Sequence, residues 1–221
     1  MKRILLTCLS VSVILYACSN EKKKEEGNKD ETKTESTETN NTSTAPPDSA
    51  AQAEMMKAWQ DFATPGPEHS WMNGHAGTWV CDSVAQWMDP AQPPTYSKAT
   101  DVVTVAMNGL YQMSDFSSNM MGMEMKGHGI MGFDKMKKKF VLSWIDNLGS
   151  GIVRMEGTYD ESSKTLTMTG KQSDPGMKKE TDMRQVMKFH DDDSYTMTMY
   201  GTGHDGKEAK FMEGTFKRTK K

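Results

Sequence analysis

Residues 194–200 read Ser-Tyr-Thr-Met-Thr-Met-Tyr, and this stretch has the pattern that decides the fold. Large apolar side chains alternate with threonine, so that Tyr195, Met197 and Met199 share one face. Successive side chains of a β-strand point to opposite faces of a sheet, and a period of two therefore predicts a strand with one buried face. The same alternation recurs in residues 165–169 and 139–146. We therefore predict a sheet of such strands.

Turn signals separate these strand patterns at short, regular intervals. Clusters rich in Asp, Asn, Gly and Ser, which favour turns, occur at 147–151, 160–163, 174–176, 190–193 and 204–206. Short strands joined by tight turns indicate a meander of antiparallel hairpins. About ten strands fit between Gly77 and residue 221, and sheets of that size usually close or split to remove exposed edges. No long crossover is evident, so we predict an all-β fold, an antiparallel meander closed into a barrel.

A short N-terminal helix is predicted before the sheet. Ser49 with Gln52 forms a capping-box pattern, and Pro65-Gly66-Pro67 ends the helix. Between them, an apolar stripe at helical spacing consists of Met55, Met56, Trp59 and Phe62. We expect this stripe to lie on the barrel or to cover one of its ends.

Gly77-Thr78-Trp79 opens the first predicted strand. This tripeptide resembles the Gly-x-Trp signature of lipocalins and other calycins. In that family the tryptophan closes one end of the barrel and packs near a basic residue of the last strand, a region that Lys217 or Arg218 occupies here. The resemblance implies a lipocalin-like barrel in which Gly77, Trp79 and Arg218 have structural roles.

A longer set of motifs covers roughly Pro65 to Arg218. It consists of residues 66–71, 77–79, 87–90, 120–123, 127–134, 143–147 and 155–160. This set resembles the DUF1579 family of bacterial proteins. One departure is Asn108-Gly109-Leu110-Tyr111, where the family often has an arginine after a Gly-Gly pair. The family has no agreed activity, so the resemblance implies a fold and not a function.

The amino terminus has the three parts of a secretory signal peptide. Lys2 and Arg3 precede an apolar run, 4–15, that is far shorter than the roughly 20 residues of a membrane-spanning helix. Leu15-Tyr16-Ala17-Cys18 resembles the lipobox of bacterial lipoproteins, although Tyr16 is bulkier than usual. The resemblance implies that residues 1–17 are removed and that Cys18 carries acyl chains such as palmitate. Two or more chains anchor a protein stably to a membrane.

Residues 18–53 are predicted to be a disordered tether between the lipid and a domain at 54–221. From Ser19 the segment has a mixed charge run, then Thr, Ser, Asn and Glu, and it contains no Leu, Ile, Val, Met or aromatic residue. Such a chain buries too little apolar surface to offset its ordering entropy. Ser19 is not the Asp that commonly retains lipoproteins in the inner membrane, which favours the outer membrane in a cell with two. The net charge of −3 gives no footprint for nucleic acid.

Enzymatic signatures are absent from the sequence. It contains no Gly-x-Ser-x-Gly, no His-Glu-x-x-His, no phosphate-binding glycine loop and no cysteine pair at zinc spacing. No cofactor is therefore expected, and an enzyme is unsupported, although these absences do not exclude one. Cys81 lies two residues after Trp79 and is expected to be a small buried residue on the same face.

Methionine is the unusual component, with 21 residues in 221. Several lie in 119–125, and Met123, Met125 and His128 could converge on one ion. Thioethers are soft ligands that suit Cu(I), so a copper-binding envelope lipoprotein is one alternative. Methionine also fills irregular apolar space, which is the simpler interpretation.

A binding module is the third class considered, because small barrels often enclose a cavity lined by alternate side chains. Trp144 and Asp146 share a face, and an aromatic wall beside a carboxylate suits a small amphipathic or cationic ligand. Tyr111, Arg154 and Tyr159 are the other candidate lining residues. We therefore predict non-enzymatic binding of a small apolar or amphipathic ligand in the cell envelope, with copper binding and a structural role as alternatives. Alternation does not decide which face points inward, and ligand identity, oligomeric state and protein partners stay open.

Overall fold

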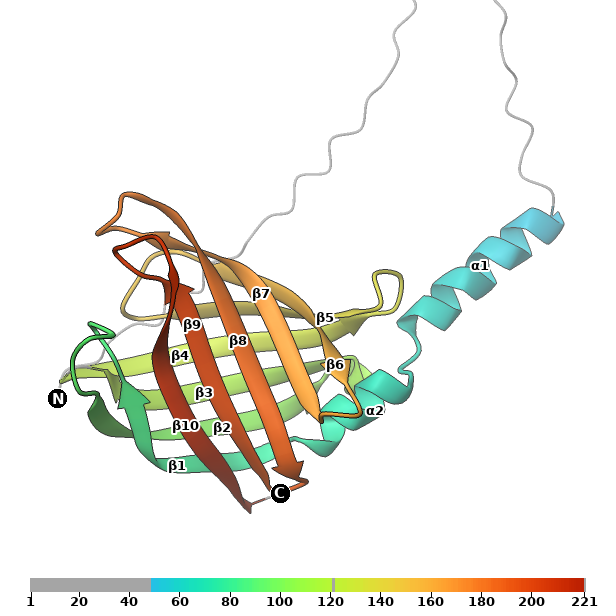
Figure 1. Ribbon diagram of the computed structural model, residues 1–221. Helices are drawn as coiled ribbons and strands as arrows, with labels where there is room; N and C mark the ends of the chain where they lie inside the picture. The colour runs from blue at the N-terminus through green and yellow to red at the C-terminus, as the bar shows by residue number, and fades with distance from the viewer. Residues whose placement is uncertain (1–48, 121, 221) are drawn as a thin grey trace, which may run out of the picture. The chain divides into compact units, whose positions relative to one another are not determined.

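The computed structural model describes residues 49–120 and 122–220, and within them ten antiparallel strands form a closed barrel (Figure 1). Each strand pairs with the next one along the chain, and β1 pairs with β10 to close the sheet. The strands are β1 (Gly77–Gln86), β2 (Thr95–Ala106), β3 (Tyr111–Met120), β4 (Met123–Asp134), β5 (Lys139–Asp146), β6 (Val153–Asp160), β7 (Thr165–Asp174), β8 (Lys179–Asp191), β9 (Ser194–Thr202) and β10 (Glu208–Lys220). The predicted barrel of about ten strands is confirmed.

Three helical segments accompany the barrel: α1 (Ser49–Ala63), α2 (Pro67–Gly74) and the one-turn η1 (Met107–Gly109) between β2 and β3. The helix predicted from Ser49 is present, and it includes residues 49–53, which the sequence had assigned to the tether. None of the helices among the described residues is long and apolar enough to span a membrane.

The alternation that predicts the strands also separates core from surface. Tyr195, Leu166 and Phe140 are buried, as their predicted faces require. Cys81 and Trp79 are buried too, which confirms that they share the inner face of β1. Burial raises the pKa of the Cys81 thiol, so this cysteine is a buried apolar residue with little thiolate character.

Three hairpins use the same local chemistry to reverse the chain. The strands β4, β6 and β7 each end in an aspartate, Asp134, Asp160 or Asp174, whose Oδ1 accepts a backbone N–H from the turn at 2.7–3.0 Å. Four residues after each aspartate lies a lysine with positive φ, at positions 138, 164 and 178. Asp satisfies turn N–H groups with its side chain, and this explains why Asp-rich clusters mark the turns in the sequence.

The helix α2, which the sequence analysis did not predict, closes one end of the barrel. Its Met72 and His69 are buried, and Gln112 of β3 donates a hydrogen bond to the Met72 carbonyl. The apolar stripe of α1 is instead exposed, with Trp59 64% accessible and no buried residue in the helix. The expectation that this stripe covers the barrel is therefore wrong, because the eight residues of α2 supply the closing surface.

Arg218 on β10 links the last strand to this closed end of the barrel. Its guanidinium lies 4.6 Å from the centre of the Trp79 ring. Nη1 donates to the carbonyl of Gly74, the last residue of α2, at 2.9 Å and to that of Ala76 at 2.5 Å. Nε lies 2.9 Å from Asp193 Oδ1 as an ion pair without hydrogen-bond geometry. The basic residue implied by the calycin resemblance is therefore Arg218, and Lys217 lies exposed beside it.

Candidate functional site

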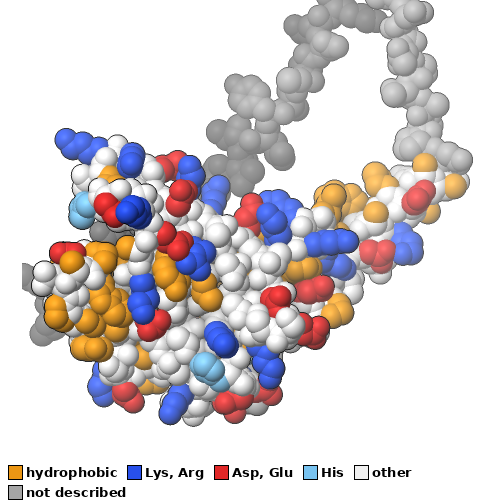
Figure 2. Space-filling view, in the orientation of Figure 1, with side chains coloured by type: hydrophobic (Ala, Val, Ile, Leu, Met, Phe, Trp, Pro, Cys, Tyr) orange, Lys and Arg blue, Asp and Glu red, His pale blue; other side chains and the backbone are white. Residues whose placement is uncertain are grey.

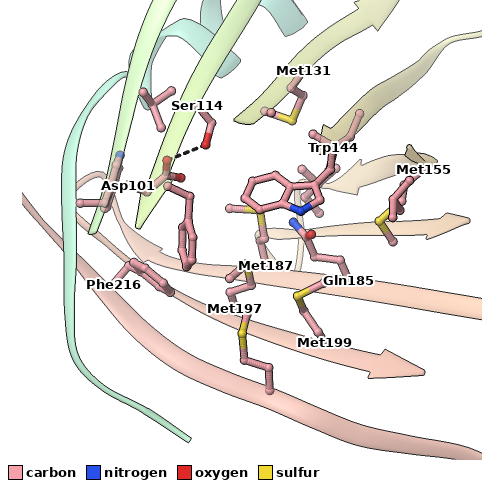
Figure 3. A pocket seen from close by; sticks show the side chains of 18 of the residues that line it. Asp101, Ser114, Met131, Trp144, Met155, Gln185, Met187, Met197, Met199 and Phe216 are labelled. Carbon is pink, nitrogen blue, oxygen red and sulfur yellow. Dashed lines mark hydrogen bonds between the residues drawn. The ribbon is translucent and has the colours of Figure 1, made fainter. Parts of the chain in front are cut away.

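A cavity of about 300 Å³ lies inside the barrel, and α2 contributes Trp71 and Met72 to its lining. This volume is at the small end of ligand pockets in proteins. Figure 3 shows other side chains that line it. Ten of its lining residues are methionines, including Met131, Met155, Met187, Met197 and Met199. The cavity extends to the rim remote from α2, where Leu148 in the β5–β6 loop lines it and is partly exposed. Hydrophobic side chains also gather on the surface at the end of the barrel away from α2 (Figure 2).

Aromatic side chains form the floor of the cavity at the closed end. Trp71 of α2 lines the cavity, and its ring centre lies 4.2 Å from that of Tyr159 and 5.3 Å from that of Phe189. His75 lies beside them, and its Nδ1 is 2.8 Å from the Trp71 carbonyl oxygen. Burial lowers the pKa of His75, so its imidazole is uncharged at neutral pH. The floor is therefore apolar and carries no charge.

Trp144 forms one wall, and two glycines make room for its indole. Gly129 lies opposite Trp144 in the β4–β5 pairing, and Gly127 lies two residues away on the same face. A Cβ atom at Gly127 would lie 2.1 Å from Cζ2 of Trp144, so the ring rests against a backbone that has no side chain there. The Gly127–Asp134 motif of the sequence thus has a packing role in the cavity wall.

Asp146 holds this indole in place. Trp144 Nε1 donates to Asp146 Oδ2 at 2.9 Å, and the backbone N–H of Leu148 donates to Oδ1 at 2.9 Å. Each carboxylate oxygen therefore already accepts a hydrogen bond from the protein. Asp146 lines the cavity but acts as a positioning residue for Trp144.

Asp101 of β2 is a second carboxyl group at the cavity. Ser114 Oγ donates to its Oδ1 at 2.5 Å, whereas Oδ2 has no partner among the described residues (Figure 3). Burial raises the pKa of Asp101 to about 6, the Ser114 hydrogen bond opposes this rise, and the charge of Asp115 adds to it. The sequence analysis missed Asp101. Its spacing from Ala99 and Val103, two residues to either side, is the signal that places it on the inner face.

Gln185 of β8 is an uncharged polar residue of the cavity. The side chain is 9% exposed, lines the cavity and forms no hydrogen bond with any described residue. Its neighbours across the sheet are Met168 on β7 and Met199 on β9, which offer only thioether sulfur. Figure 3 shows the amide pointing into the cavity among methionines. Sequence reasoning missed this residue as well, because a glutamine in a strand is usually on the solvent side.

The predicted lining residues divide into two groups. Trp144 and Asp146 line the cavity, and Tyr159 lies behind its floor against Trp71. Tyr111 and Arg154 do not: Tyr111 is 43% exposed, and Arg154 is exposed on β6. The correction follows from alternation, because their strand neighbours Gln112 and Met155 are the residues that point inward.

The structure does not bring the predicted copper ligands together. Met125 lines the cavity and Met123 is exposed at the start of β4. His128 lies on the opposite face of the strand, where its Nδ1 is 2.6 Å from Asp115 Oδ1. The residues that the structure describes contain no group of three His, Cys, Asp or Glu side chains placed to hold a metal ion. The lipidation candidate Cys18 lies outside the described residues.

Comparison with known proteins places the whole barrel in one family. A family model described as "Protein of unknown function (DUF1579)" matches residues 64–218. No curated protein matches the chain. The match runs from just before α2 almost to the end of β10, so it includes the cavity and both of its ends.

Proposed function

This chain belongs to the DUF1579 family, and we propose that its barrel binds a small, mainly apolar ligand that carries at least one polar group. The observation that carries the proposal is the Gln185 amide, nine-tenths buried in an apolar cavity and without a hydrogen-bond partner among the described residues. An amide that faces a cavity and has no protein partner is available to a polar group of a ligand. A glutamine that only filled space would be replaced by leucine or methionine with a gain in stability. A ligand that pairs with the amide gives it the hydrogen-bond partner that the protein does not supply.

The methionine walls fit the same function. Thioether side chains are flexible and polarizable, and they adapt to irregular apolar shapes. Met187 and Met197 face each other across β8 and β9, with Met199 two residues further along. These side chains surround Gln185, so a ligand held there contacts thioethers along its apolar part and the amide at its polar part. This arrangement of thioethers around one amide suits the binding of an apolar molecule.

Replacement of Gln185 by leucine tests the proposal, because it has two opposite expected effects. The change removes the amide and keeps an apolar side chain of similar size, so the ligand-free protein should gain about 1 kcal/mol in the free energy of unfolding. The same change should weaken ligand binding about tenfold, which corresponds to about 1.4 kcal/mol. Urea unfolding and tryptophan fluorescence titration measure the two effects. A more stable variant that binds every ligand as well as wild type contradicts the role of Gln185.

We propose in addition that the barrel is displayed on the cell envelope by a lipid on Cys18, on the outer membrane where the cell has two. The support is the charged start, apolar run and lipobox-like Leu15 to Cys18 of the sequence. Cys18→Ser should release the chain from the membrane fraction and abolish its labelling with palmitate. Cys8→Ser is the matched control and should change neither. Membrane association that persists in Cys18→Ser contradicts the proposed anchor.

A further inference from the structure

The charged side chains that line the cavity are all acidic. Asp101 and Asp146 line it, and no lysine or arginine does so among the described residues. His75 is uncharged at neutral pH because burial lowers its pKa. The cavity therefore presents a negative charge to any molecule that enters it, inside walls that are mostly apolar.

The two carboxyl groups differ in how many of their oxygens already accept a hydrogen bond. Asp146 accepts one hydrogen bond on each oxygen from Trp144 and Leu148. Asp101 accepts one from Ser114 on Oδ1, and its Oδ2 has no partner among the described residues. A partly buried carboxylate with an open oxygen and no counter-ion is a strong acceptor for an incoming donor. Asp101 is thus the carboxyl group of the cavity that has an oxygen without any hydrogen-bond partner among the described residues.

We propose that the cavity selects apolar molecules whose polar end is a hydrogen-bond donor, an amine or an alcohol, with Asp101 as the acceptor, and that it excludes carboxylates. This inference rests on the proposed function and specifies the ligand class. The positive charge of an amine supplies the counter-ion that the Asp101 carboxylate lacks. A carboxylate such as a fatty acid would enter an apolar space beside a second negative charge and lose its hydration.

The surroundings of Asp101 offer nothing that reverses this preference. The titratable groups that interact with Asp101 are Asp115 on the outer face of β3 and Tyr195 on β9, and Cys81 on β1 in turn acts on Tyr195. Burial raises the pKa of both Tyr195 and Cys81, so both are neutral, and Asp115 is acidic. The Gln185 and Gln172 amides could donate to a carboxylate, but neutral donors do not offset the desolvation of an anion.

Three probes that share a decyl chain test the selection: decylamine, decanol and decanoate. They are titrated into the purified full chain at about pH 7.5, and binding is followed by tryptophan fluorescence, since Trp71, Trp79 and Trp144 line the cavity. Decylamine should bind most tightly and decanoate at least about tenfold more weakly than decylamine. Asp101→Asn should reduce the difference in affinity between decylamine and decanoate to less than about threefold. Asp182→Asn, the same change on the exposed face of β8, should leave it unchanged.

A pH series on wild type repeats the test without a substitution. Decylamine and decanol keep their charge between about pH 5 and 7.5, whereas Asp101 gains a proton as the pH falls through about 6. The preference for the amine over the alcohol should therefore disappear near pH 5.

The outcomes separate the inference from the function on which it rests. Decanoate binding as tightly as decylamine, or a preference for the amine that survives both Asp101→Asn and low pH, overturns the inference and leaves ligand binding intact. Failure of all three probes to bind overturns the proposed function as well.

Discussion

Asp101→Asn is expected to stabilise the barrel at neutral pH and to leave its stability unchanged in acid. Burial raises the pKa of Asp101 from 3.8 to about 6, so the folded protein keeps a proton on this carboxyl where the unfolded chain has lost it. Above that range the folded state carries a charge that has no counter-ion. Asparagine removes the charge and keeps an oxygen that can accept the hydrogen bond of Ser114.

The size of the effect follows from the two pKa values. A difference of one pKa unit corresponds to about 1.4 kcal/mol, so a folded-state pKa of about 6 against 3.8 corresponds to roughly 3 kcal/mol. Because the folded-state pKa is the higher one, the stability of wild type falls as the pH rises from about 4 to 6 and stays lower above 6. The gain from asparagine should therefore be absent near pH 3.5 and reach at most about 3 kcal/mol at pH 7.5.

Urea unfolding followed by circular dichroism at several pH values measures this difference. Asp182→Asn is the matched control, because Asp182 is exposed on the outer face of β8. It should change stability by less than about 0.5 kcal/mol at any pH. Equal stability of wild type and Asp101→Asn at pH 7.5, or a gain of the same size near pH 3.5, would refute the reasoning.

Two further substitutions test the packing of the cavity and its closed end. Gly127→Ala should displace the Trp144 indole, cost about 1–3 kcal/mol of stability and shift the tryptophan emission, whereas Gly149→Ala, where an added Cβ meets nothing within 4 Å, should do neither. An unchanged emission spectrum in Gly127→Ala would show that the ring does not rest on that glycine. Arg218→Met should cost about 2 kcal/mol through lost hydrogen bonds to the carbonyls at and just after the end of α2, and the neighbouring exposed Lys217→Met should cost almost nothing. Equal losses in the two variants, measured by urea unfolding, would argue against the role of Arg218.

Local patterns carried enough information to predict the barrel. Alternation in 194–200 and aspartate at turns such as Asp160 and Asp174 are short-range signals, and β-strands and hairpins are short-range structures. The closing helix α2 escaped prediction because its eight residues lie between Pro65 and the first strand and show too little periodicity. Its burial depends on tertiary contacts with β3 and Arg218 that no local pattern reveals.

Only some of the residues that line the cavity were predicted, and the reason differs from that for α2. Alternation shows which residues share a face, and it correctly kept Trp144 with Asp146. Alternation does not decide which face points inward when a strand has large side chains on both faces. Tyr111 and Arg154 were therefore assigned inward although they point out.

The residues whose polar atoms lack a hydrogen-bond partner were missed because of their residue type. Asp101 and Gln185 are polar residues that usually face solvent, and a sequence gives no information about which polar atoms lack a partner. That property emerges only when the barrel closes and the hydrogen bonds can be followed one by one.

Native mass spectrometry of the chain, purified gently from the envelope of its host, tests the central claim most directly. Binding in the cavity predicts an added organic mass on the wild-type protein that disappears on denaturation and is reduced in Gln185→Leu prepared in the same way. A bare protein mass for wild type, unchanged after addition of decylamine or decanol, would contradict the claim that the cavity is a binding site.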